Sequence, residues 1–525
     1  MKSNSASLDG SNLTINILDS LVKEPEKKIT LKKSVLNASQ VGHNFLINTI
    51  KQNNKIIYGI NTGFGPMANY ILAHGQILEL QKNLVLSHAV GIGEKIKDDF
   101  VYSAMTIRLN TLLRGYSGVS PELLNYLEKF INYRIIPIVP EHGAVGTSGD
   151  LVQLAHIALA IIGKGEVSYK GKIQKTSNVL KKLNIKPYEL KPKEGLALIN
   201  GTSMMTGIAS VTCIDTANLL NLALFNGCLA LELVKAYDDS YSQELHDLRP
   251  HAGQLAISKY IRELLKDSKT IRNREVLHKN SNTGEQVNII TESVQEVYSM
   301  RCLAQILGPV YDSLVDSWKT TEVEMNSVTD NPIIDWKNGK FLHGGNFHGD
   351  YIAVSMDKLK MGLVKMTMLS ERRLNFFLNH KINHTFPPFL NLQTPGLTLG
   401  FQALQFVATS TTANSQTLAY PMNLHSIPTN GDNQDVVSMG TDAALLTHKV
   451  AENAFVVLAI ETLALCQAVD YLEIQNKLSK NSRNLYNFTR SNFKKVVNDR
   501  ELQPELKEFL ENIKNWSGFN LFKRF

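Results

Sequence analysis

Apolar residues in the second half of the chain recur at the spacing of one face of an α-helix. Ile352, Met356, Leu359, Leu363 and Met366 follow one another at alternating intervals of four and three residues. This is the period of a helix that buries one stripe against neighbouring helices. The stretch is therefore predicted to form a long helix within a bundle.

Two more segments carry the same periodicity. Leu446, Val450 and Val457 predict the start of another long helix. A third helix is expected to run from Val294 and Val297 through the apolar stripe of residues 307–318, with Pro309 inside it. From about residue 216 onwards the pattern is that of a long-helix bundle.

The N-terminal part of the chain mixes helical patterns with short extended runs. Residues 135–139 read as a strand, and residues 167–173 read as a small hairpin. Asn338-Gly339, further along, marks a tight turn between two extended runs. We predict a mainly α protein with a mixed domain over residues 1–215 and a helix bundle over residues 216–525.

Composition is that of an ordinary soluble globular protein. Apolar residues make up 43% and charged residues 20% of the 525 positions. The net charge of +7 comes from scattered lysines, so neither a nucleic-acid partner nor a membrane partner is expected. Residues 195–214 lack formal charge, but their many Ser, Thr and Asn residues favour a buried segment over a membrane span.

The four cysteines are widely spaced and include no Cys-x-x-Cys pair, so neither a zinc site nor a disulfide framework is predicted. The polar N-terminus has no apolar core of the kind a signal peptide needs. We expect a cytoplasmic protein with no bound metal and no nucleotide.

The segment from Gly143 to Asp150 reads Gly-Ala-Val-Gly-Thr-Ser-Gly-Asp. The nitrogen of Gly149 could attack the carbonyl carbon of Thr147, and loss of water, including the Ser148 hydroxyl, would leave an electrophilic methylidene-imidazolone ring. Glycine suits the attacking position because it has no Cβ to block a close backbone approach.

Three ordinary interpretations compete for the same residues. Thr-Ser-Gly-Asp is more often a polar turn, with Ser148 or Asp150 as the N-cap of a helix. A phosphate-binding loop needs a lysine that is missing here. A hydrolase nucleophile elbow needs Gly-x-Ser-x-Gly, but Asp150 holds the last position.

Other segments favour the ring-forming interpretation of residues 147–149. Together with residues 143–156, they make the chain resemble the aromatic amino-acid lyase family. That family comprises the histidine, phenylalanine and tyrosine ammonia-lyases and the related aminomutases. One departure is Thr147, where the family usually has alanine. The other matching stretches run in family order and are residues 58–65, 83–88, 195–202, 298–301, 330–332, 344–348 and 433–440.

The resemblance implies a long-helix bundle of the fumarase/aspartase-like type and a 4-methylidene-imidazole-5-one (MIO) group formed from Thr147, Ser148 and Gly149. It further implies a homotetramer whose active sites are assembled from several subunits. The reaction would remove ammonia across the Cα–Cβ bond of an aromatic amino acid.

Tyr58 is the expected general base for the β-proton of the substrate. A phenol ordinarily loses its proton only near pH 10, so this role needs hydrogen bonds or positive charge nearby and predicts an alkaline optimum. Arg301 is expected to bind the substrate carboxylate with its planar fork. Asn200 and Tyr298 are expected to hydrogen-bond the ring oxygen and the substrate amine.

Several more residues match pocket positions of the family. Gln295, Tyr298 and Arg301 are spaced so that one helical face could present all three. A helix is expected to start near Asp150 and to aim its positive end at the ring. The remaining predicted pocket residues are Gly65, Leu151, Asn331 and Phe347.

Two positions bear on the substrate and disagree. Ser87-His88 resembles the histidine-type pair, whereas Gln434 resembles the phenylalanine and tyrosine enzymes, because histidine ammonia-lyases carry glutamate there. A missing carboxylate weighs against an imidazole substrate, and His88 could hydrogen-bond a phenol. We predict tyrosine going to trans-p-coumarate.

Three alternatives stay open at the level of sequence. The first is a histidine ammonia-lyase giving urocanate, and the second is a phenylalanine or tyrosine aminomutase. The third is a catalytically dead helical scaffold, against which the intact Tyr58, Ser148, Asn200 and Arg301 argue.

Overall fold

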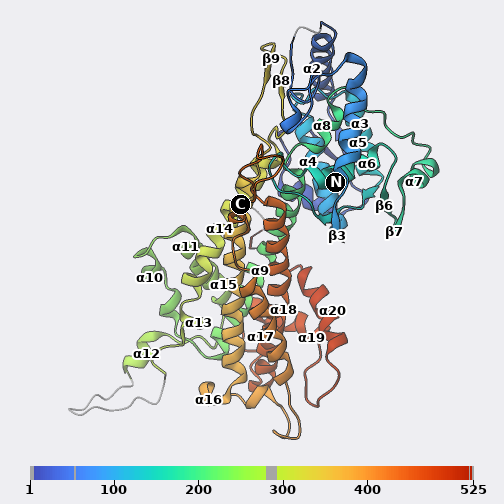
Figure 1. Cartoon of the computed structure of the whole chain (residues 1–525). Coiled ribbons are helices and arrows are strands. Elements are labelled where there is room, and N and C mark those ends of the chain that lie inside the picture. Colours follow the sequence, from blue (N-terminus) through green and yellow to red (C-terminus); the bar gives the residue numbers. More distant parts are fainter. Residues whose placement is uncertain (1–4, 53–54, 280–292, 520, 523–525) are drawn as a thin grey trace. The chain divides into compact units, whose positions relative to one another are not determined.

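The computed structural model describes residues 5–52, 55–279, 293–519 and 521–522. These residues form two compact units, each made of segments that are separate in the sequence (Figure 1). The first unit combines residues 1–214, 317–357 and 421–448, and the second combines 215–316, 358–420 and 449–525. The first unit thus includes two stretches that the sequence analysis had placed in the C-terminal domain.

The first unit is built mostly from short and medium helices. Helix α5 shows why such segments fold locally: Ser120 caps its N-terminus by accepting from the Leu123 amide, and Pro121 occupies the first turn. Helices α3, α6 and α8 pack against one another, and α4 packs on α5. The α-helices are α1 (Ile15–Lys23), α2 (Lys33–Gln52), α3 (Ile77–His88), α4 (Asp98–Leu112), α5 (Pro121–Asn132), α6 (Leu151–Ile161), α7 (Thr176–Lys182) and α8 (Glu194–Ile199), with 3-10 turns at Gly65–Met67, His74–Gln76 and Met422–Leu424.

The strands of the first unit form small, separate sheets. Two predictions are confirmed here: the hairpin of residues 167–173 is β6–β7, and Asn338-Gly339 turns between β8 and β9. The pairs are β1 (Ser5–Leu8) with β2 (Lys28–Leu31), β3 (Ile92–Lys95) with β5 (Pro140–His142), β4 (Ile136–Pro137) with β6 (Glu166–Tyr169), β6 with β7 (Lys172–Lys175), and β8 (Ile333–Asp335) with β9 (Lys340–Leu342).

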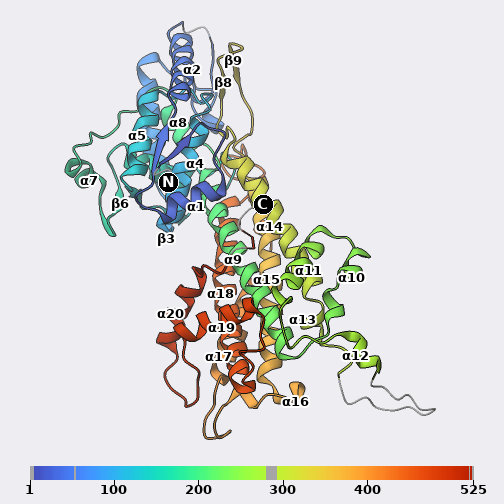
Figure 2. The same ribbon diagram turned by 180° about the vertical axis from the view of Figure 1, so that it is seen from behind.

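The second unit contains helices alone among its described residues. Figures 1 and 2 show α15, α17 and α18 running side by side, and α19 packs on α11 and α20. The shorter α-helices are α10 (Gln243–Asp247), α11 (Ala252–Leu265), α12 (Arg274–Lys279), α13 (Tyr298–Arg301), α16 (His380–Asn383), α17 (Gln402–Thr417), α19 (Lys480–Asn492) and α20 (Gln503–Lys514), with 3-10 turns at Asp238–Tyr241 and Pro388–Leu390.

Four long helices contribute residues to both units: α9 (Ser203–Leu233), α14 (Leu303–Met325), α15 (Asp350–Leu378) and α18 (Gly440–Leu472). The stripe from Ile352 to Met366 lies in α15 and is buried, which confirms its predicted role. The third predicted helix begins later than expected. Val294 and Val297 are exposed and precede α13, and α14 starts only at Leu303.

Helices α9 and α18 are long and apolar enough to cross a membrane by length and composition. In each, 78% of the most apolar window is buried inside the protein. Burial of this extent identifies them as core helices, as expected for the uncharged segment that precedes and enters α9. The four cysteines are free thiols.

Candidate active site

The segment around Ser148 follows an unusual backbone path. Ser148 and Gly149 both adopt left-handed conformations, with φ of 65° and 70°. A Cβ at position 149 would overlap the carbonyl oxygen of Gly201, so only glycine fits there. The left-handed serine is a strained conformation of the kind that persists at functional sites.

Asp150 fixes the end of this segment. Helix α6 begins directly after it, which confirms the predicted helix start. Its buried carboxylate does not cap α6 but accepts from the amides of Met204 and Met205, at 2.9 and 3.0 Å, and so caps α9. Burial raises the pKa of Asp150 to about 6. One carboxylate thereby ties the Ser148 segment to the start of α9.

A cavity of about 690 Å³ opens onto Ser148 within the first unit. None of the described residues that line it is Asp, Glu, Lys or Arg. The site is therefore electrically neutral, with polar atoms supplied by amides, hydroxyls and an imidazole. Twelve predicted site residues line it: Tyr58, Gly65, Ser87, His88, Thr147, Ser148, Gly149, Leu151, Asn200, Asn331, Phe347 and Gln434.

Tyr58 lies on this cavity and receives a hydrogen bond at its phenol oxygen. The amide of Gly65 donates to Oη at 3.0 Å, so this oxygen acts as an acceptor in the structure. Gly65 itself has a φ of 52°, and a Cβ there would crowd the side chain of Asn430. The glycine-rich segment of residues 59–65 thus brings a backbone donor to the predicted base.

Asn200 lies at the C-terminal end of α8, and only one of its two side-chain polar atoms has a hydrogen-bond partner among the described residues. Its Nδ2 donates to the carbonyl oxygen of Ser148 at 3.0 Å. Its Oδ1 is buried and has no hydrogen-bond partner among the described residues. A buried acceptor left open is costly unless a ligand satisfies it, so Oδ1 is a ready acceptor for an N–H group in the cavity.

His88 has a defined tautomer. Its Nδ1 lies 2.9 Å from the carbonyl oxygen of Leu84, which can only accept, so Nδ1 carries the proton. Nε2 of the neutral ring is then an acceptor, and it has no partner among the described residues. Ser87 donates to the same Leu84 carbonyl at 3.2 Å and helps to hold this arrangement.

Gln434, Asn331 and Phe347 complete the cavity from other segments of the first unit. Gln434 is buried, and its Nε2 donates to Ser148 Oγ at 3.2 Å. Asn331 accepts from the Gly344 amide at 2.9 Å, which orients its side chain. Phe347 is half-buried rather than packed in the core.

Three predicted residues belong to the second unit and do not line this cavity: Gln295, Tyr298 and Arg301. Gln295 lies in the loop before α13, so the expectation that all three share one helical face is wrong. The turn of α13 is too short to include it. Arg301 stacks over the ring of Tyr298 at 4.6 Å, and its buried Nε has no partner among the described residues.

Sequence reasoning missed a buried cluster that positions Asn200 and Asn331. Arg108 donates to the backbone carbonyls of Ala197 and Asn200, and burial lowers its pKa to about 10. Lys193 pairs with Asp330 at 2.7 Å, with both side chains almost fully buried. Asp330 could have been singled out, because it precedes Asn331 in a matched motif. Nothing in the sequence marks the distant Lys193 as its partner.

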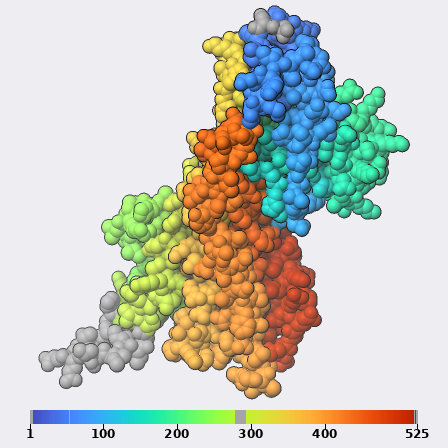
Figure 3. All heavy atoms as spheres, viewed as in Figure 1, coloured from blue at the N-terminus to red at the C-terminus, as the bar shows by residue number. Residues whose placement is uncertain are grey.

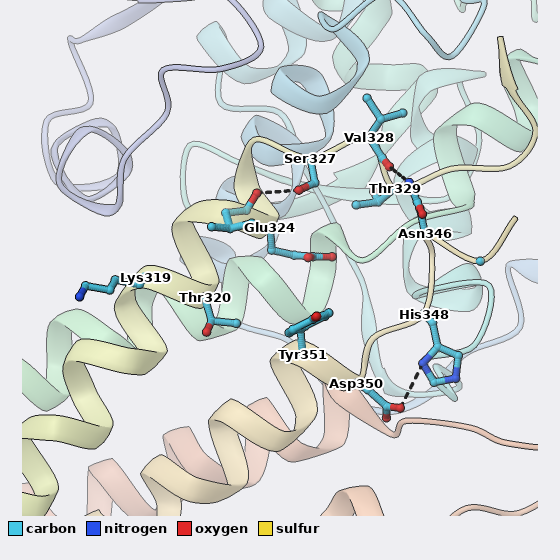
Figure 4. A pocket seen from close by; sticks show the side chains of 12 residues that line it. Lys319, Thr320, Glu324, Ser327, Val328, Thr329, Asn346, His348, Asp350 and Tyr351 are labelled. Carbon is cyan, nitrogen blue, oxygen red and sulfur yellow. Dashed lines mark hydrogen bonds and ion pairs between the residues drawn. The ribbon is translucent and has the colours of Figure 1, made fainter. Parts of the chain in front are cut away.

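A second cavity in the first unit, of about 710 Å³, has a different character (Figure 4). Helix α14 supplies one wall with Lys319 and Glu324, and His348 and Asp350 face each other at 3.5 Å. It contains charged groups and none of the predicted site residues. The neutral cavity around Ser148 is therefore the candidate active site.

Comparison with known proteins matches this chain to one family. A model of the family described as aromatic amino acid lyase matches residues 13–491. A histidine ammonia-lyase of Bacillus mycoides (strain KBAB4) is 35% identical over 98% of this chain and 97% of its own length. The chain belongs to the aromatic amino acid lyase family.

Solved structures agree with this assignment. The tyrosine aminomutase of Streptomyces globisporus superposes with a TM-score of 0.93 at 33% identity, covering 97% of each chain. The phenylalanine aminomutase of Pantoea agglomerans gives the same TM-score and identity, covering 98% of this chain and all of that one. The mainly helical fold predicted from the sequence is thereby confirmed.

Proposed function

We propose that this protein is an ammonia-lyase that acts on an aromatic L-amino acid, with L-tyrosine as its main substrate and trans-p-coumarate as its product. In this reaction the Cα–N bond breaks, one β-proton leaves, and a Cα=Cβ double bond forms. The observation that carries the proposal is the neutral cavity built around the left-handed Ser148-Gly149 segment. The family is known for a self-formed MIO group at this place.

The residues fit that group. Bond formation between the Gly149 nitrogen and the Thr147 carbonyl carbon would release the Thr147 carbonyl oxygen as one water. The Ser148 hydroxyl and its Cα proton would leave as the second. Gly149 has no Cβ to oppose the Gly201 carbonyl, and Asn200 Nδ2 already donates to the Ser148 oxygen. The finished group supplies an electrophile that makes the substrate amine a better leaving group.

Residues of the chain itself then remove the β-proton and bind the amine and the carboxylate of the substrate. Tyr58 takes the β-proton at Oη, assisted by the Gly65 amide. Asn200 Oδ1 accepts from the substrate amine, which satisfies its open lone pairs. Arg301 binds the substrate carboxylate through its planar fork.

His88 supports tyrosine as the substrate. Its Nε2 is an acceptor because Leu84 holds the proton on Nδ1, and a phenol O–H is a matching donor. A pocket that pairs such a hydroxyl discriminates against analogues that lack it. Gln434 supports the same choice, because the described cavity has no carboxylate to pair with an imidazolium.

L-Histidine is the second candidate, and the names of the curated relatives favour it. The Bacillus mycoides protein and a Treponema denticola protein, each 35% identical, are histidine ammonia-lyases. An imidazole N–H could also donate to His88 Nε2. The structural relatives add a third possibility, a tyrosine or phenylalanine aminomutase, which would return ammonia to the β-carbon.

A homotetramer with shared active sites completes the proposal. The cavity residues include no cation for the substrate carboxylate, and Arg301 belongs to the other unit. We infer that another copy of the chain supplies Arg301, Tyr298 and Gln295. Large apolar side chains are exposed on α17, namely Phe406 and Val407, and give the second unit a surface for self-association. The orange part of the chain, to which α17 belongs, lies on the face seen in Figure 3.

The test is a parallel assay of purified protein with L-tyrosine, L-histidine and L-phenylalanine, read by the ultraviolet absorbance of the unsaturated acids. The account expects p-coumarate as the dominant product and no product from Ser148→Ala. Dominant urocanate would replace tyrosine by histidine. A β-amino acid, detected by chromatography, would establish an aminomutase.

A further inference from the structure

Thr147 makes a contact that the alanine usual at this position cannot make. The residue is buried, and its hydroxyl donates to the carbonyl oxygen of Val436 at 2.9 Å. The same carbonyl lies 3.3 Å from Nε2 of His348, so it has two donors. The threonine therefore adds a direct link between the cyclising tripeptide and the segment that carries Gln434.

That segment is the Gln434 loop, residues 429–440. It runs antiparallel to residues 145–148 of the same chain, because successive residues of one segment bond to successively earlier residues of the other. The links pair Val145 with Met439 and Gly146 with Ser438, each at 3.0 Å, then Thr147 with Val436 at 2.9 Å, and Ser148 with Gln434 at 3.2 Å.

Formation of the ring would change this set of contacts unequally. The Ser148 hydroxyl leaves as water, so the link from Gln434 Nε2 to Ser148 Oγ is lost. Only the carbonyl carbon of Thr147 enters the ring, so its side chain and the link to Val436 remain. The Thr147 hydroxyl then becomes the side-chain contact nearest to Gln434 that still joins the two segments.

We propose that Thr147 is a positioning residue that holds the Gln434 loop in register after the Ser148 hydroxyl has gone. Gln434 is then presented to the substrate by a fixed loop, while its amide is free of its earlier partner. This inference rests on the proposed function, because it assumes that the ring forms. It assigns no chemical step to Thr147, which acts through Gln434.

The test compares Thr147→Val, which keeps the shape but removes the hydroxyl, with Thr147→Ser, which keeps the hydroxyl. Intact mass first establishes that each protein has lost two waters. Hydrogen exchange of peptides covering residues 429–440 then measures how firmly the loop is held. Loss of one buried hydrogen bond should speed exchange in Thr147→Val roughly fivefold, and Thr147→Ser should restore the wild-type rate.

A matched control is Thr412→Val in α17. Thr412 is as buried as Thr147, but its hydroxyl bonds to Ala408 within its own helix. This variant should leave exchange of the Gln434 loop unchanged. For the preferred substrate, Thr147→Val should raise KM several-fold more than it lowers kcat, since the loop positions a binding group.

The outcomes separate the two proposals. Unchanged exchange in a Thr147→Val protein that has lost two waters would overturn the role of Thr147 and leave the proposed function intact. A Thr147→Val protein that fails to lose water would also overturn it, by placing Thr147 in ring formation. A wild-type protein at full sequence mass would overturn the proposed function itself.

Discussion

At the scale of single residues, His88 and Asn200 are each held through one side-chain atom, and a second atom of each is left open to the cavity. His88 is fixed through Nδ1, which leaves Nε2 as an acceptor. Asn200 is fixed through Nδ2, which leaves Oδ1 buried and unpaired. Tyr58 receives a donor from Gly65. Such preorganisation keeps the groups aimed before a ligand arrives.

His88→Leu tests the contact with the substrate ring. The change removes the Nε2 acceptor, so the preference for tyrosine over phenylalanine, measured as the ratio of their kcat/KM values, should fall at least about tenfold. His380→Leu, an exposed histidine in α16, should leave that ratio unchanged. An unaltered ratio in His88→Leu would remove the phenol contact from the account.

Asp442→Asn tests a pH dependence of stability. Burial, together with Glu141, raises the pKa of Asp442 to about 6, against a partial opposing effect of His142. A carboxyl whose pKa is raised in the folded state binds protons more tightly there, so its stabilising contribution is present below about pH 4 and is lost as the pH rises to about 6. The melting temperature of Asp442→Asn should therefore gain on wild type across that window.

Asp9→Asn provides a control of opposite sign. A hydrogen bond from Lys32 lowers the pKa of Asp9, so its contribution to stability is present at neutral pH and is lost as the pH falls. The difference in melting temperature between this variant and wild type should shrink toward acid pH. The same pH trend in both variants would contradict the assignment.

At the scale of elements, short segments are tied together beneath the cavity by buried charges. Lys193, just before α8, pairs with Asp330, which precedes Asn331. Arg108, from α4, donates hydrogen bonds to backbone carbonyl oxygens at the end of α8. These contacts set the positions of Asn200 and Asn331 without touching a ligand. Burial of such charges is tolerated only because each has a partner.

Lys193→Met should destabilise the protein by about 3–5 kcal/mol, because Asp330 would be left buried without its partner. Urea unfolding, followed by circular dichroism, measures the change. Lys259→Met breaks an exposed pair with Glu263 and should cost less than about 1 kcal/mol. Equal effects of the two substitutions would show that the buried pair does not hold the segments.

The sequence predicted what rests on local pattern. The stripe from Ile352 to Met366, the hairpin of residues 167–173 and the turn at Asn338-Gly339 were all readable from periodicity and turn chemistry. Long-range pairs such as Lys193 with Asp330 leave no periodic trace. The start of α14 was misplaced because Val294 and Val297 continue an apolar spacing yet remain exposed.

Motif matching likewise placed the residues of the site but not their bonds. The residues from Tyr58 to Gln434 that it selected in the first unit line one cavity. The tautomer of His88, the open Oδ1 of Asn200 and the link from Thr147 to Val436 depend on partners that only the folded chain reveals. Gln295 shows where prediction from spacing fails. Its spacing from Tyr298 and Arg301 suggested a shared helix, but α13 begins only at Tyr298.

At the scale of the whole molecule, the neutral cavity is incomplete for an amino-acid substrate. A carboxylate needs a cation or several donors, and the described cavity residues supply no cation. The proposed tetramer resolves this by bringing Arg301 from another copy. In this proposal, the apolar side chains exposed on α17 form part of the contact between copies.

Subunit complementation tests this sharing of residues. Tyr58→Phe and Arg301→Ala should each be inactive as pure proteins, because each site loses its base or its anchor. Co-expression of the two should produce mixed oligomers in which some sites draw an intact tyrosine from one copy and an intact arginine from another. Activity clearly above both parents is expected, and complete inactivity of isolated mixed oligomers would contradict the shared site.

The central claim is that Thr147, Ser148 and Gly149 become an electrophile without outside help. Intact mass spectrometry of the purified wild type and of Ser148→Ala measures this most directly. The account predicts a wild-type mass lower than the sequence mass by two waters, and a Ser148→Ala protein that does not show this deficit. A wild type that turns over substrate at its full sequence mass would contradict the account.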